Sequence, residues 1–307
     1  MMNLLFIAHD TSSFIHRSFF YLEQELANVV NVEVWRKSGH IDTILKQLHK
    51  KPDFILIMND IEKEMSPQIR GLAHIDVPVG LFINDAHRFT KLRKSYIEKH
   101  NIPYLLPVVR DYFLKTYPEY EKKMIWMPHF VQTELFKDYE LEKDIDLLLI
   151  GAVNDYYPIR QKIRKAYEGD ADFVYYKHPG YRNFNGEEEE LHAIGESYAK
   201  VLNRAKITFT CPSKLFYPVL KYYEALACKT LLLAPTFTEL EDLGFRPGYH
   251  FVAIDEHNFQ EKATYYLTNE KERLKIVEQG YQFVRKYHSL QVRTQQLVNR
   301  MERILQM

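Results

Sequence analysis

Short apolar runs alternate with segments of helical periodicity along most of the chain, and this alternation limits the fold more than any other feature. The runs Leu4–Ala8, Phe54–Met58 and Val79–Ile83 have the unbroken apolar character of strands that are buried on both faces. Apolar residues at helical spacing follow the first run, over residues 14–29. Strands that alternate with helices indicate a parallel sheet with helices on both faces. The sequence therefore predicts an α/β fold.

The alternation of predicted strands and helices starts again after residues 128–143, a polar stretch that contains scattered aromatic residues. That stretch has no clear period, and we interpret it as a hinge. Ile145–Ile150 is the first predicted strand beyond it. A chain of 307 residues also suits two domains of ordinary size. We expect domains at residues 1–138 and 139–287, with a separate C-terminal helix at 288–307.

Composition argues against several classes of protein. Lys+Arg and Asp+Glu both number 41, so no net charge indicates nucleic acid or an anionic membrane as partner. The two cysteines, Cys211 and Cys228, make no disulfide or metal framework, which favours a reduced, cytoplasmic compartment. No signal peptide is evident at the N-terminus, and no run approaches the roughly 20 apolar residues of a membrane span. We therefore expect a soluble cytoplasmic protein.

The most informative stretch for function begins at Pro218. Proline suits the first turn of a helix, so we predict a helix over Val219–Cys228. The short apolar run Thr230–Ala234 follows as a buried strand. Lys221 and Glu224 are three positions apart, which places them on one face of the predicted helix.

This helix start can bind a nucleotide. The free N–H groups of Val219 and Leu220, together with Lys221, can hold a diphosphate, because unpaired N–H groups at a helix start attract anions. The carboxylate of Glu224 can accept two hydrogen bonds from a ribose diol. The alternative is an ordinary surface ion pair between Lys221 and Glu224, which the residues alone leave open.

Further segments occur in the same order as in a known family. They are Trp126–Phe136, Asp144–Gly151, Tyr157–Arg160 and Tyr198–Asn203, then His288 with Arg293. Together with the stretch around Glu224, they resemble the nucleotide-sugar segment of GT-B glycosyltransferases, specifically the spore-maturation CgeB/YkvP-like group related to glycosyl transferases group 1. The resemblance covers residues 80–300 and is loosest towards the N-terminus.

The resemblance implies a fold and an activity. The fold is GT-B, in which two Rossmann-like domains face each other across a cleft and the C-terminal helix crosses back to the N-terminal domain. The activity is transfer of a sugar from a nucleoside diphosphate sugar, a UDP-sugar before others, to an unidentified acceptor. The family works without a metal or other cofactor, and we carry over retention of configuration. The first domain would present the acceptor and the second would hold the donor.

One position departs from the family pattern. The larger GT-B class carries two glutamates eight positions apart on the donor helix. Glu224 matches the second, but the position of the first is Phe216. This change removes a carboxylate that would contact the sugar, so the identity of the sugar stays open.

Candidate catalytic residues follow two predicted strands of the first domain. Asp85 and His87 come just past a strand end, where a side chain can move a proton or hold a sugar hydroxyl. The resemblance assigns His87 to the donor sugar. His9, after the first strand, occupies the usual acceptor-side loop. The alternative for each histidine is a loop residue without a ligand.

Candidate donor-binding residues lie in loops of the second domain. Gly151 and Asn154 follow a predicted strand, where the backbone can approach a diphosphate without a Cβ. Lys177 starts a predicted loop at residues 177–190 and can neutralise phosphate charge, although a solvated lysine explains it equally well. Tyr217 is a candidate for stacking on the base or lining its pocket.

Two Asp-x-Asp triplets, Asp144 with Asp146 and Asp170 with Asp172, suggest the metal site of GT-A transferases. Both triplets precede strands, where aspartates commonly close turns. GT-B relatives also bind their donors without an essential metal. We therefore predict no metal site.

Other basic residues have simpler interpretations. We interpret Arg160 as structural. The helix predicted after His87 is basic, and its usual meaning is a solvated face, with an anionic acceptor (glycan or protein) or transient membrane docking as functional alternatives. Its basic residues are Arg88, Lys91, Arg93, Lys94 and Lys99.

Two other functions fit the same scaffold. A nucleotide-sugar epimerase would need an acid/base pair, which His9, Asp85, His87 and Lys177 can supply, and would act on the donor alone. A non-catalytic nucleotide-binding protein is compatible with Phe216, and would bind nucleotide without transferring or hydrolysing sugar.

Overall fold

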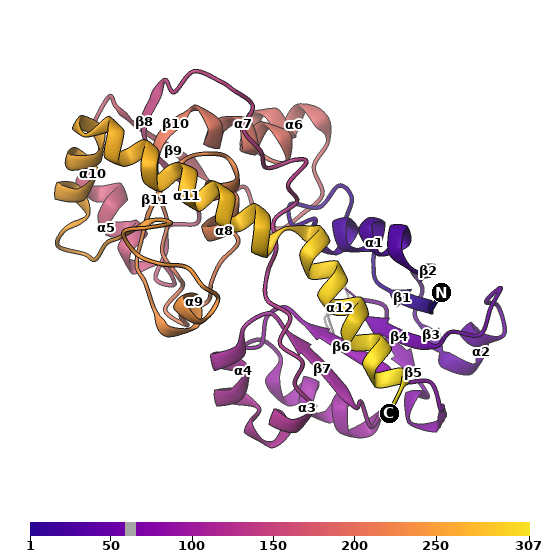
Figure 1. The fold of residues 1–307 in the computed structure, drawn as a ribbon. Coiled ribbons are helices and arrows are strands. Elements are labelled where there is room, and N and C mark those ends of the chain that lie inside the picture. Colours follow the sequence, from indigo (N-terminus) through magenta and orange to yellow (C-terminus); the bar gives the residue numbers. More distant parts are fainter. Residues whose placement is uncertain (59–65) are drawn as a thin grey trace. The chain divides into compact units, whose positions relative to one another are not determined.

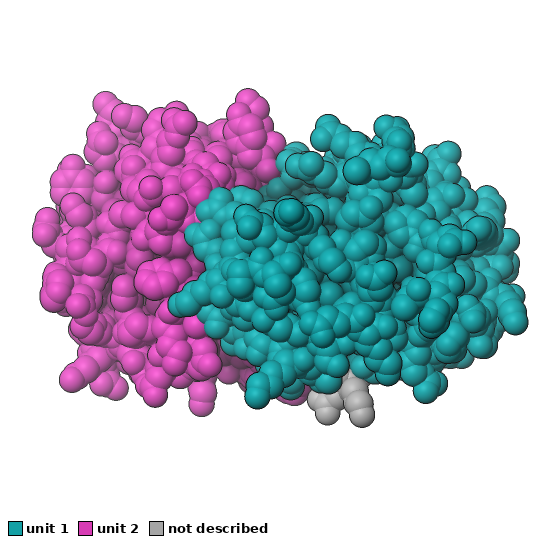
Figure 2. All heavy atoms as spheres, turned by 90° about the horizontal axis from the view of Figure 1, so that it is seen from below, with its two compact units in different colours: residues 1–12, 16–128, 290–307 teal, residues 13–15, 129–289 magenta. Residues whose placement is uncertain are grey.

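A computed structural model describes residues 1–58 and 66–307 of the chain. These residues divide into two compact units, which Figure 2 colours separately. Unit 1 comprises residues 1–12, 16–128 and 290–307, and unit 2 comprises residues 13–15 and 129–289. Each unit has its own parallel sheet.

Unit 1 is built on a five-stranded sheet in which all neighbouring strands are parallel, in the order β2-β1-β4-β6-β7. The apolar runs of the sequence form its three central strands, which are almost entirely buried. Its strands are β1 (Asn3–Ile7), β2 (Asn31–Trp35), β4 (Phe54–Ile57), β6 (Val79–Ile83) and β7 (Tyr104–Pro107), and a separate parallel pair is formed by β3 (Gly39–His40) and β5 (Ile69–Arg70).

The helices of unit 1 include one from the far end of the chain. They are α1 (Ser18–Val29), α2 (Ile41–Leu45), η1 (Leu72–His74), α3 (Thr90–Lys99), α4 (Arg110–Thr116), η2 (Pro118–Lys123) and α12 (Leu290–Leu305). Helix α12 packs beside α1 (Figure 1). Its residues Leu297, Val298 and Met301 are buried. The chain therefore returns to unit 1 at Leu290 after completing unit 2.

Unit 2 contains a second five-stranded parallel sheet, in the order β12-β11-β10-β8-β9. Along β8, an interior strand of this sheet, Leu147 and Leu149 join one core cluster, whereas Leu148 and Ile150 join another. Both faces of the sheet are therefore buried, which explains the unbroken apolar run. The strands are β8 (Ile145–Gly151), β9 (Phe173–Lys177), β10 (Ala205–Phe209), β11 (Leu231–Ala234) and β12 (Val252–Ala253).

Helices cover both faces of the unit 2 sheet. They are α5 (Pro158–Ala166), α6 (Gly186–His192), α7 (Glu196–Arg204), α8 (Lys221–Ala227), α9 (Thr238–Asp242), α10 (Phe259–Thr268) and α11 (Glu270–His288). Buried residues of α7 and α8 belong to one core cluster, and those of α5 and α10 to the other. The α/β prediction, with parallel sheets and helices on both faces, is confirmed.

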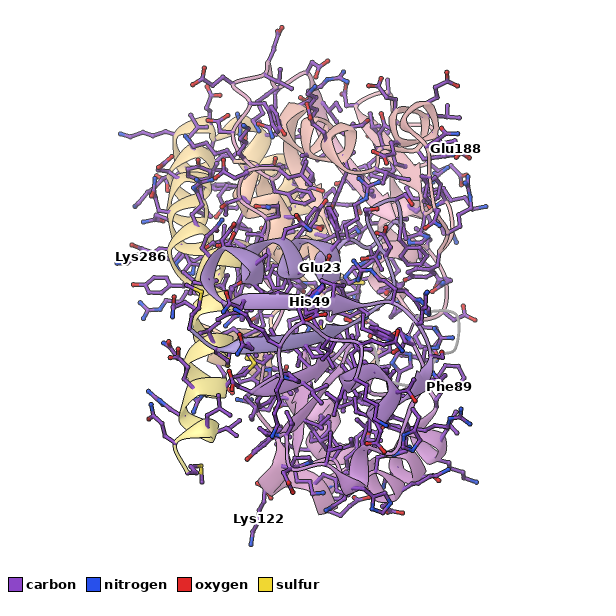
Figure 3. All side chains as sticks on the ribbon, turned by 90° about the vertical axis from the view of Figure 1, so that its right-hand side faces the viewer. Glu23, His49, Phe89, Lys122, Glu188 and Lys286 are labelled. Atoms are coloured by element: carbon purple, nitrogen blue, oxygen red, sulfur yellow. The ribbon has the colours of Figure 1, made fainter. Side chains whose placement is uncertain are left out.

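Two helices of unit 2 differ from the predictions. Helix α8 begins at Lys221 and not at Val219, so Pro218 lies before the helix and not in its first turn. The predicted loop 177–190 is wrong at its end, because α6 begins there. Asn185 accepts a hydrogen bond from the N–H of Glu188 (2.9 Å), and the Glu188 carboxylate accepts one from the N–H of Asn185 (3.2 Å). This reciprocal capping stabilises the helix start, where Glu188 is labelled in Figure 3.

Candidate functional site

The topology of unit 2 indicates where a ligand would bind. The chain passes from β8 to β9 on one side of the sheet, and then to β10, β11 and β12 on the other. Open parallel sheets bind ligands at the carboxyl ends of strands where the direction reverses in this way. Gly151 is the last residue of β8, so the candidate site begins there.

Two cationic side chains converge on Gly151. Its φ of +120° favours glycine, and a Cβ added to it would lie 3.1 Å from Cε and 3.5 Å from Nζ of Lys221. The same Cβ would lie 3.3 Å from Nη1 of Arg160. The absence of a side chain at Gly151 therefore lets both cations approach its backbone.

Arg160 joins the two loops that border this position. It is only 3% exposed, and its Nη1 donates to the carbonyl of Ala152 (3.3 Å). Its Nη2 donates to Oγ1 of Thr210 (3.0 Å) and to the carbonyl of Cys211 (3.2 Å). Its Nε is buried and has no hydrogen-bond partner among residues 1–58 and 66–307. Arg160 thus organises both loops, and it also places a charge beside Gly151 that the sequence interpretation missed.

Lys221 is half-buried at the start of α8, with its Nζ 5.5 Å from the ring centre of Tyr198. Burial lowers the pKa of Lys221 to about 8, against the opposing influence of the Glu224 carboxylate. The charge of Arg160 lowers this pKa further. Close to neutral pH the lysine is therefore still mainly protonated, but it loses its charge more easily than a surface lysine.

Glu224 is 8% exposed and lies one turn along α8 from Lys221. The Tyr198 hydroxyl donates a hydrogen bond to its Oε2 across 2.9 Å. Burial raises the pKa of the Glu224 carboxyl, whereas the Lys221 charge and the Tyr198 hydrogen bond lower it. Because Glu224 is buried, the alternative of an ordinary surface ion pair with Lys221 is wrong.

The segment just before α8 has the expected free donors. The N–H groups of Val219 and Leu220 have no hydrogen-bond acceptor in the part of the chain that the structure describes. Tyr217, immediately before them, is buried. Helix α8 has only seven residues, so any attraction of an anion at its start comes mainly from Lys221 and Arg160 and less from the helix dipole.

The end of β9 contributes a residue that was not predicted. Lys177 is the last residue of this strand and its side chain is exposed. The next residue, His178, is partly buried, and burial together with the charges of Lys221 and Arg160 lowers its pKa to about 4. Successive residues of a strand point to opposite sides, so this alternation was the signal that could have directed attention from Lys177 to His178.

Asn154 shapes the loop after β8. Its Oδ1 accepts a hydrogen bond from the N–H of Tyr156 (3.0 Å), and its carbonyl accepts one from the N–H of Tyr157 (2.8 Å). This turn leads directly into α5, which carries Arg160. The predicted contact of Asn154 with a ligand stays a prediction.

The candidate residues of unit 1 lie at the carboxyl edge of its sheet. Asp85 and His87 follow β6, and the negative charge of Asp85 raises the pKa values of both His87 and His16. Burial is the larger influence and lowers both pKa values overall. The structure therefore brings Asp85 near two histidines, of which His16, just before α1, was not predicted.

His9 belongs to the same edge of the unit 1 sheet. It follows β1, is half-buried, and its carbonyl accepts a hydrogen bond from Nη1 of Arg36 (3.5 Å). Two polar atoms that follow strands of this sheet, Oγ1 of Thr11 after β1 and Oδ1 of Asn84 after β6, are buried without a hydrogen-bond partner among the described residues. Buried polar atoms of this kind are expected where a ligand completes the hydrogen bonding.

Side chains of both Asp-x-Asp triplets have partners within the protein. Asp144 accepts two hydrogen bonds from Arg204 (2.8 and 2.5 Å), and Asp146 pairs with Lys206 (2.5 Å). In the second triplet, the Asp170 side chain accepts from the N–H of Asp172 within a turn (2.9 Å). Within residues 1–58 and 66–307, no group of three or more His, Cys, Asp or Glu side chains is arranged to hold a metal ion.

The basic helix predicted after His87 is α3, and only part of it is a solvated face. Arg93 is buried, and its Nη1 donates to the carbonyl of Arg88 (2.7 Å) and to the Tyr117 hydroxyl (2.6 Å). Placing Arg93 on the solvated face was therefore wrong, because this arginine ties the loop after β6 to Tyr117, the residue between α4 and η2. Lys94 pairs with Glu119 (2.5 Å).

Residues 140–299 match a family model described as glycosyl transferase-like, which covers just over half of the chain. No curated protein matches the chain by sequence. No helix in the described part of the chain is long and apolar enough to cross a membrane.

Several solved structures share the fold at low sequence identity. Anabaena HepE in complex with UDP and glucose is 10% identical, with a TM-score of 0.66 over 98% of this chain and 100% of that chain. Sucrose-phosphate synthase from Thermosynechococcus elongatus is 11% identical, with a TM-score of 0.65 over 99% of both chains. A glycosyltransferase from Rickettsia africae is 10% identical, with a TM-score of 0.60 over 99% of this chain and 98% of that chain. The predicted GT-B fold is confirmed.

Proposed function

This chain belongs to the glycosyl transferase-like family, and from that membership we propose which donor it uses and how it holds it. The protein is a glycosyltransferase with a GT-B fold. We propose a nucleoside diphosphate sugar as donor, a UDP-sugar before others. Support comes from Anabaena HepE, whose structures contain UDP and UDP-glucose.

The observation that carries this proposal is the convergence of two cations on the backbone of Gly151. Lys221 and Arg160 meet there at the carboxyl end of β8, where an open parallel sheet binds its ligand. A diphosphate needs positive charge and N–H donors, and Lys221, Arg160 and the N–H groups of Val219 and Leu220 supply both. Gly151 and Asn154 shape the adjoining loop, and we assign Lys177 to the outer side of the same phosphate site.

The same cations assist the chemical step. As the bond between the sugar C1 and the diphosphate oxygen breaks, negative charge grows on the leaving nucleoside diphosphate. Partly buried, fixed cations stabilise this charge better than water does, because they need no reorganisation during the reaction. No metal ion is required in this proposal. Retention of configuration is carried over from the family resemblance.

Glu224 and Tyr217 are assigned to the nucleoside. The carboxylate of Glu224 would accept hydrogen bonds from both ribose hydroxyls, and the Tyr198 hydroxyl holds that carboxylate in one orientation. The buried ring of Tyr217 is assigned to the wall of the base pocket.

The residues of unit 1 are assigned to the sugar and the acceptor. His87, whose pKa is influenced by the charge of Asp85, would act on the donor sugar, and His9 would face the acceptor. The acceptor we propose is an anionic glycan or protein, and not a nucleic acid. We also keep as proposals the CgeB/YkvP-like subfamily and a cytoplasmic location.

The test measures what the full-length protein does to UDP-glucose alone. We expect UDP and free glucose to be released slowly, with water in place of the acceptor, and release to fall at least tenfold in Lys221→Met. An epimerised sugar nucleotide without UDP release would favour the epimerase. Tight UDP binding without release, under any acceptor screen, would favour a non-catalytic protein.

A further inference from the structure

Unit 1 has a pocket of about 560 Å³ that the proposed function does not use. Three elements surround it: the pair of short strands β3 and β5, and the outer half of α3. The described lining residues that determine its chemistry are Gln68, Arg70, Leu92, Ser95, Tyr96, Lys99 and His100. Pockets of this volume typically bind small ligands.

The pocket is separated from the candidate catalytic residues of unit 1 by the length of α3. That helix begins at Thr90, just after His87, and ends at Lys99 in the pocket wall. Ten helical residues span about 15 Å. Phe89 lies just before Thr90, at the end of α3 opposite the pocket, and is 44% exposed (Figure 3). The pocket is therefore a second location and not an extension of the residues around His87.

The described residues of the pocket carry positive charge without a negative counterpart. Arg70 and Lys99 are exposed, and no ion pair of either residue occurs in the described part of the chain. No carboxylate of residues 1–58 or 66–307 belongs to the lining. Burial, and then the Lys99 charge, lowers the pKa of His100, so its ring is neutral at pH 7. Two cations therefore define the charge of the pocket, in a chain whose net charge is zero.

The remaining lining suits a polar ring with one apolar face. The ring of Tyr96 lies beside that of His100, with their centres 4.5 Å apart, and presents an aromatic wall. Leu92 is 56% exposed and adds apolar surface. The side chains of Ser95 and Gln68 offer hydrogen-bonding groups. A sugar ring has hydroxyls at its rim and C–H groups on its faces, so it matches such a lining.

We propose that this pocket binds a phosphorylated saccharide, with Arg70 and Lys99 on the phosphate and the wall of Tyr96, Leu92 and Ser95 on the sugar. The planar guanidinium of arginine can pair with two phosphate oxygens at once. A lysine in the same pocket adds a second positive charge, which balances the second negative charge of the phosphate dianion. The ligand is either a free sugar phosphate or a phosphosugar unit of a polymer. This proposal does not depend on the donor site assigned in unit 2.

Calorimetric titration of the full-length protein in saturating UDP tests the pocket. Glucose 6-phosphate should bind at least about tenfold more tightly than glucose or inorganic phosphate, because each of these fills only half of the pocket. Arg70→Gln and Lys99→Gln should each weaken glucose 6-phosphate about tenfold or more, as expected for loss of a charge-assisted hydrogen bond. Both variants should bind UDP as the wild type does.

Lys91→Gln is the matched control, because Lys91 is an exposed lysine of α3 outside the pocket. If Lys91→Gln weakened glucose 6-phosphate binding as much as Arg70→Gln and Lys99→Gln do, the binding would reflect general charge attraction, and the proposal would be overturned. Inorganic phosphate that binds as tightly as glucose 6-phosphate would overturn the saccharide assignment.

Two supporting outcomes identify the source of the ligand. Tighter binding of the phosphomonoester, glucose 6-phosphate, indicates a free sugar phosphate, and tighter binding of its methyl phosphodiester indicates a polymer unit. Loss of UDP binding with intact glucose 6-phosphate binding would count against the donor site alone.

Discussion

The Tyr198 hydroxyl, on α7, donates to Oε2 of Glu224, on α8, across 2.9 Å. Both side chains are buried, so this bond fixes the direction of a carboxylate inside unit 2. It occupies only one lone pair, and Oε1 and the second lone pair of Oε2 can still accept hydrogen bonds. Tyr198 is therefore a positioning residue for the carboxylate that we assign to the ribose.

Replacing Glu224 with Gln should weaken nucleotide binding. The amide has the same shape but offers one acceptor oxygen and no charge. Charge-assisted hydrogen bonds contribute about 1.5–3 kcal/mol, so UDP affinity should fall roughly 10- to 150-fold in calorimetric titration. The 2′-deoxy analogue should bind the wild type poorly and lose much less on mutation, since one partner hydroxyl is already missing. Parallel losses for the two ligands, or none for either, would remove Glu224 from the site.

Nucleotide binding should depend on pH through Lys221. Its pKa is lowered to about 8 in the folded protein, so the wild type should lose UDP affinity as the pH rises through that value. Lys221→Met should bind UDP at least tenfold more weakly at pH 7 and should show little of this pH dependence. Lys177→Met is the comparison for a lysine at an exposed strand end. If Lys177→Met abolished the pH dependence and Lys221→Met did not, the phosphate charge would be assigned to the wrong lysine.

Lys221 also makes stability depend on pH. Between about pH 8 and the ordinary lysine pKa of about 10.4, the unfolded chain keeps the proton that the folded protein has released. The unfolded state binds more protons in this window, so this lysine makes the free energy of unfolding rise with pH there. Urea unfolding of the wild type and of Lys221→Met is measured across this pH window. The contribution of Lys221 to the rise in the free energy of unfolding should be present in the wild type and absent from Lys221→Met.

His87→Ala should reduce turnover strongly and leave UDP binding unchanged, because we assign His87 to the sugar. Burial lowers its pKa, so the ring is neutral and able to accept a proton at pH 7, and wild-type turnover should fall only below its ordinary pKa of about 6.5. His49, an exposed histidine after α2, provides the control variant His49→Ala (Figure 3). Equal loss of turnover and UDP binding in His87→Ala would mean that the residue only supports its loop.

Two glycine variants separate backbone strain from the approach of Lys221. Gly151→Ala places a methyl group 3.1 Å from Cε of Lys221 at a φ of +120°, so it should both destabilise unit 2 and weaken UDP binding. Gly169→Ala has a φ of +82°, but its methyl group meets no atom of the described residues within 4 Å. Each should lower the free energy of unfolding by about 1–3 kcal/mol, whereas only Gly151→Ala should change UDP affinity. Unchanged UDP binding in Gly151→Ala would contradict the phosphate site.

Chelation should leave donor turnover nearly unchanged, because the proposed phosphate site consists of side-chain cations and N–H groups. UDP release from UDP-glucose is measured with and without EDTA. A loss of more than tenfold, restored by Mn²⁺ or Mg²⁺, would favour metal catalysis and reopen the Asp-x-Asp interpretation.

Much of the fold could be predicted because its determinants are local. The run Leu147–Ile150 is apolar at every position, as expected of a strand that is covered on both faces. Helix boundaries were less predictable. Pro218 is compatible with a first helical turn, but the structure delays the helix to Lys221, and α6 depends on a capping pair that composition does not reveal.

The candidate site was only partly predictable because its residues meet through long-range contacts. The i, i+3 spacing of Lys221 and Glu224 is the same in a surface pair and in a buried one, so sequence could not decide between them. Arg160 bonds to Thr210, fifty residues away, and His178 is affected by the charge of Lys221. Such relationships depend on which strand ends lie side by side, and that order follows from the complete topology.

The packing of α12 on α1 sets an order of events during synthesis. The ribosome delivers every residue of unit 2 before it delivers Leu290. Unit 2 can therefore complete its sheet and helices while α1 still lacks its covering helix. Domains generally fold as units during synthesis, and apolar surface that waits for a late segment is prone to aggregate. A nascent chain that stalls before α12 would carry a folded second unit on an incomplete first one, which is the kind of product that chaperones and proteases recognise.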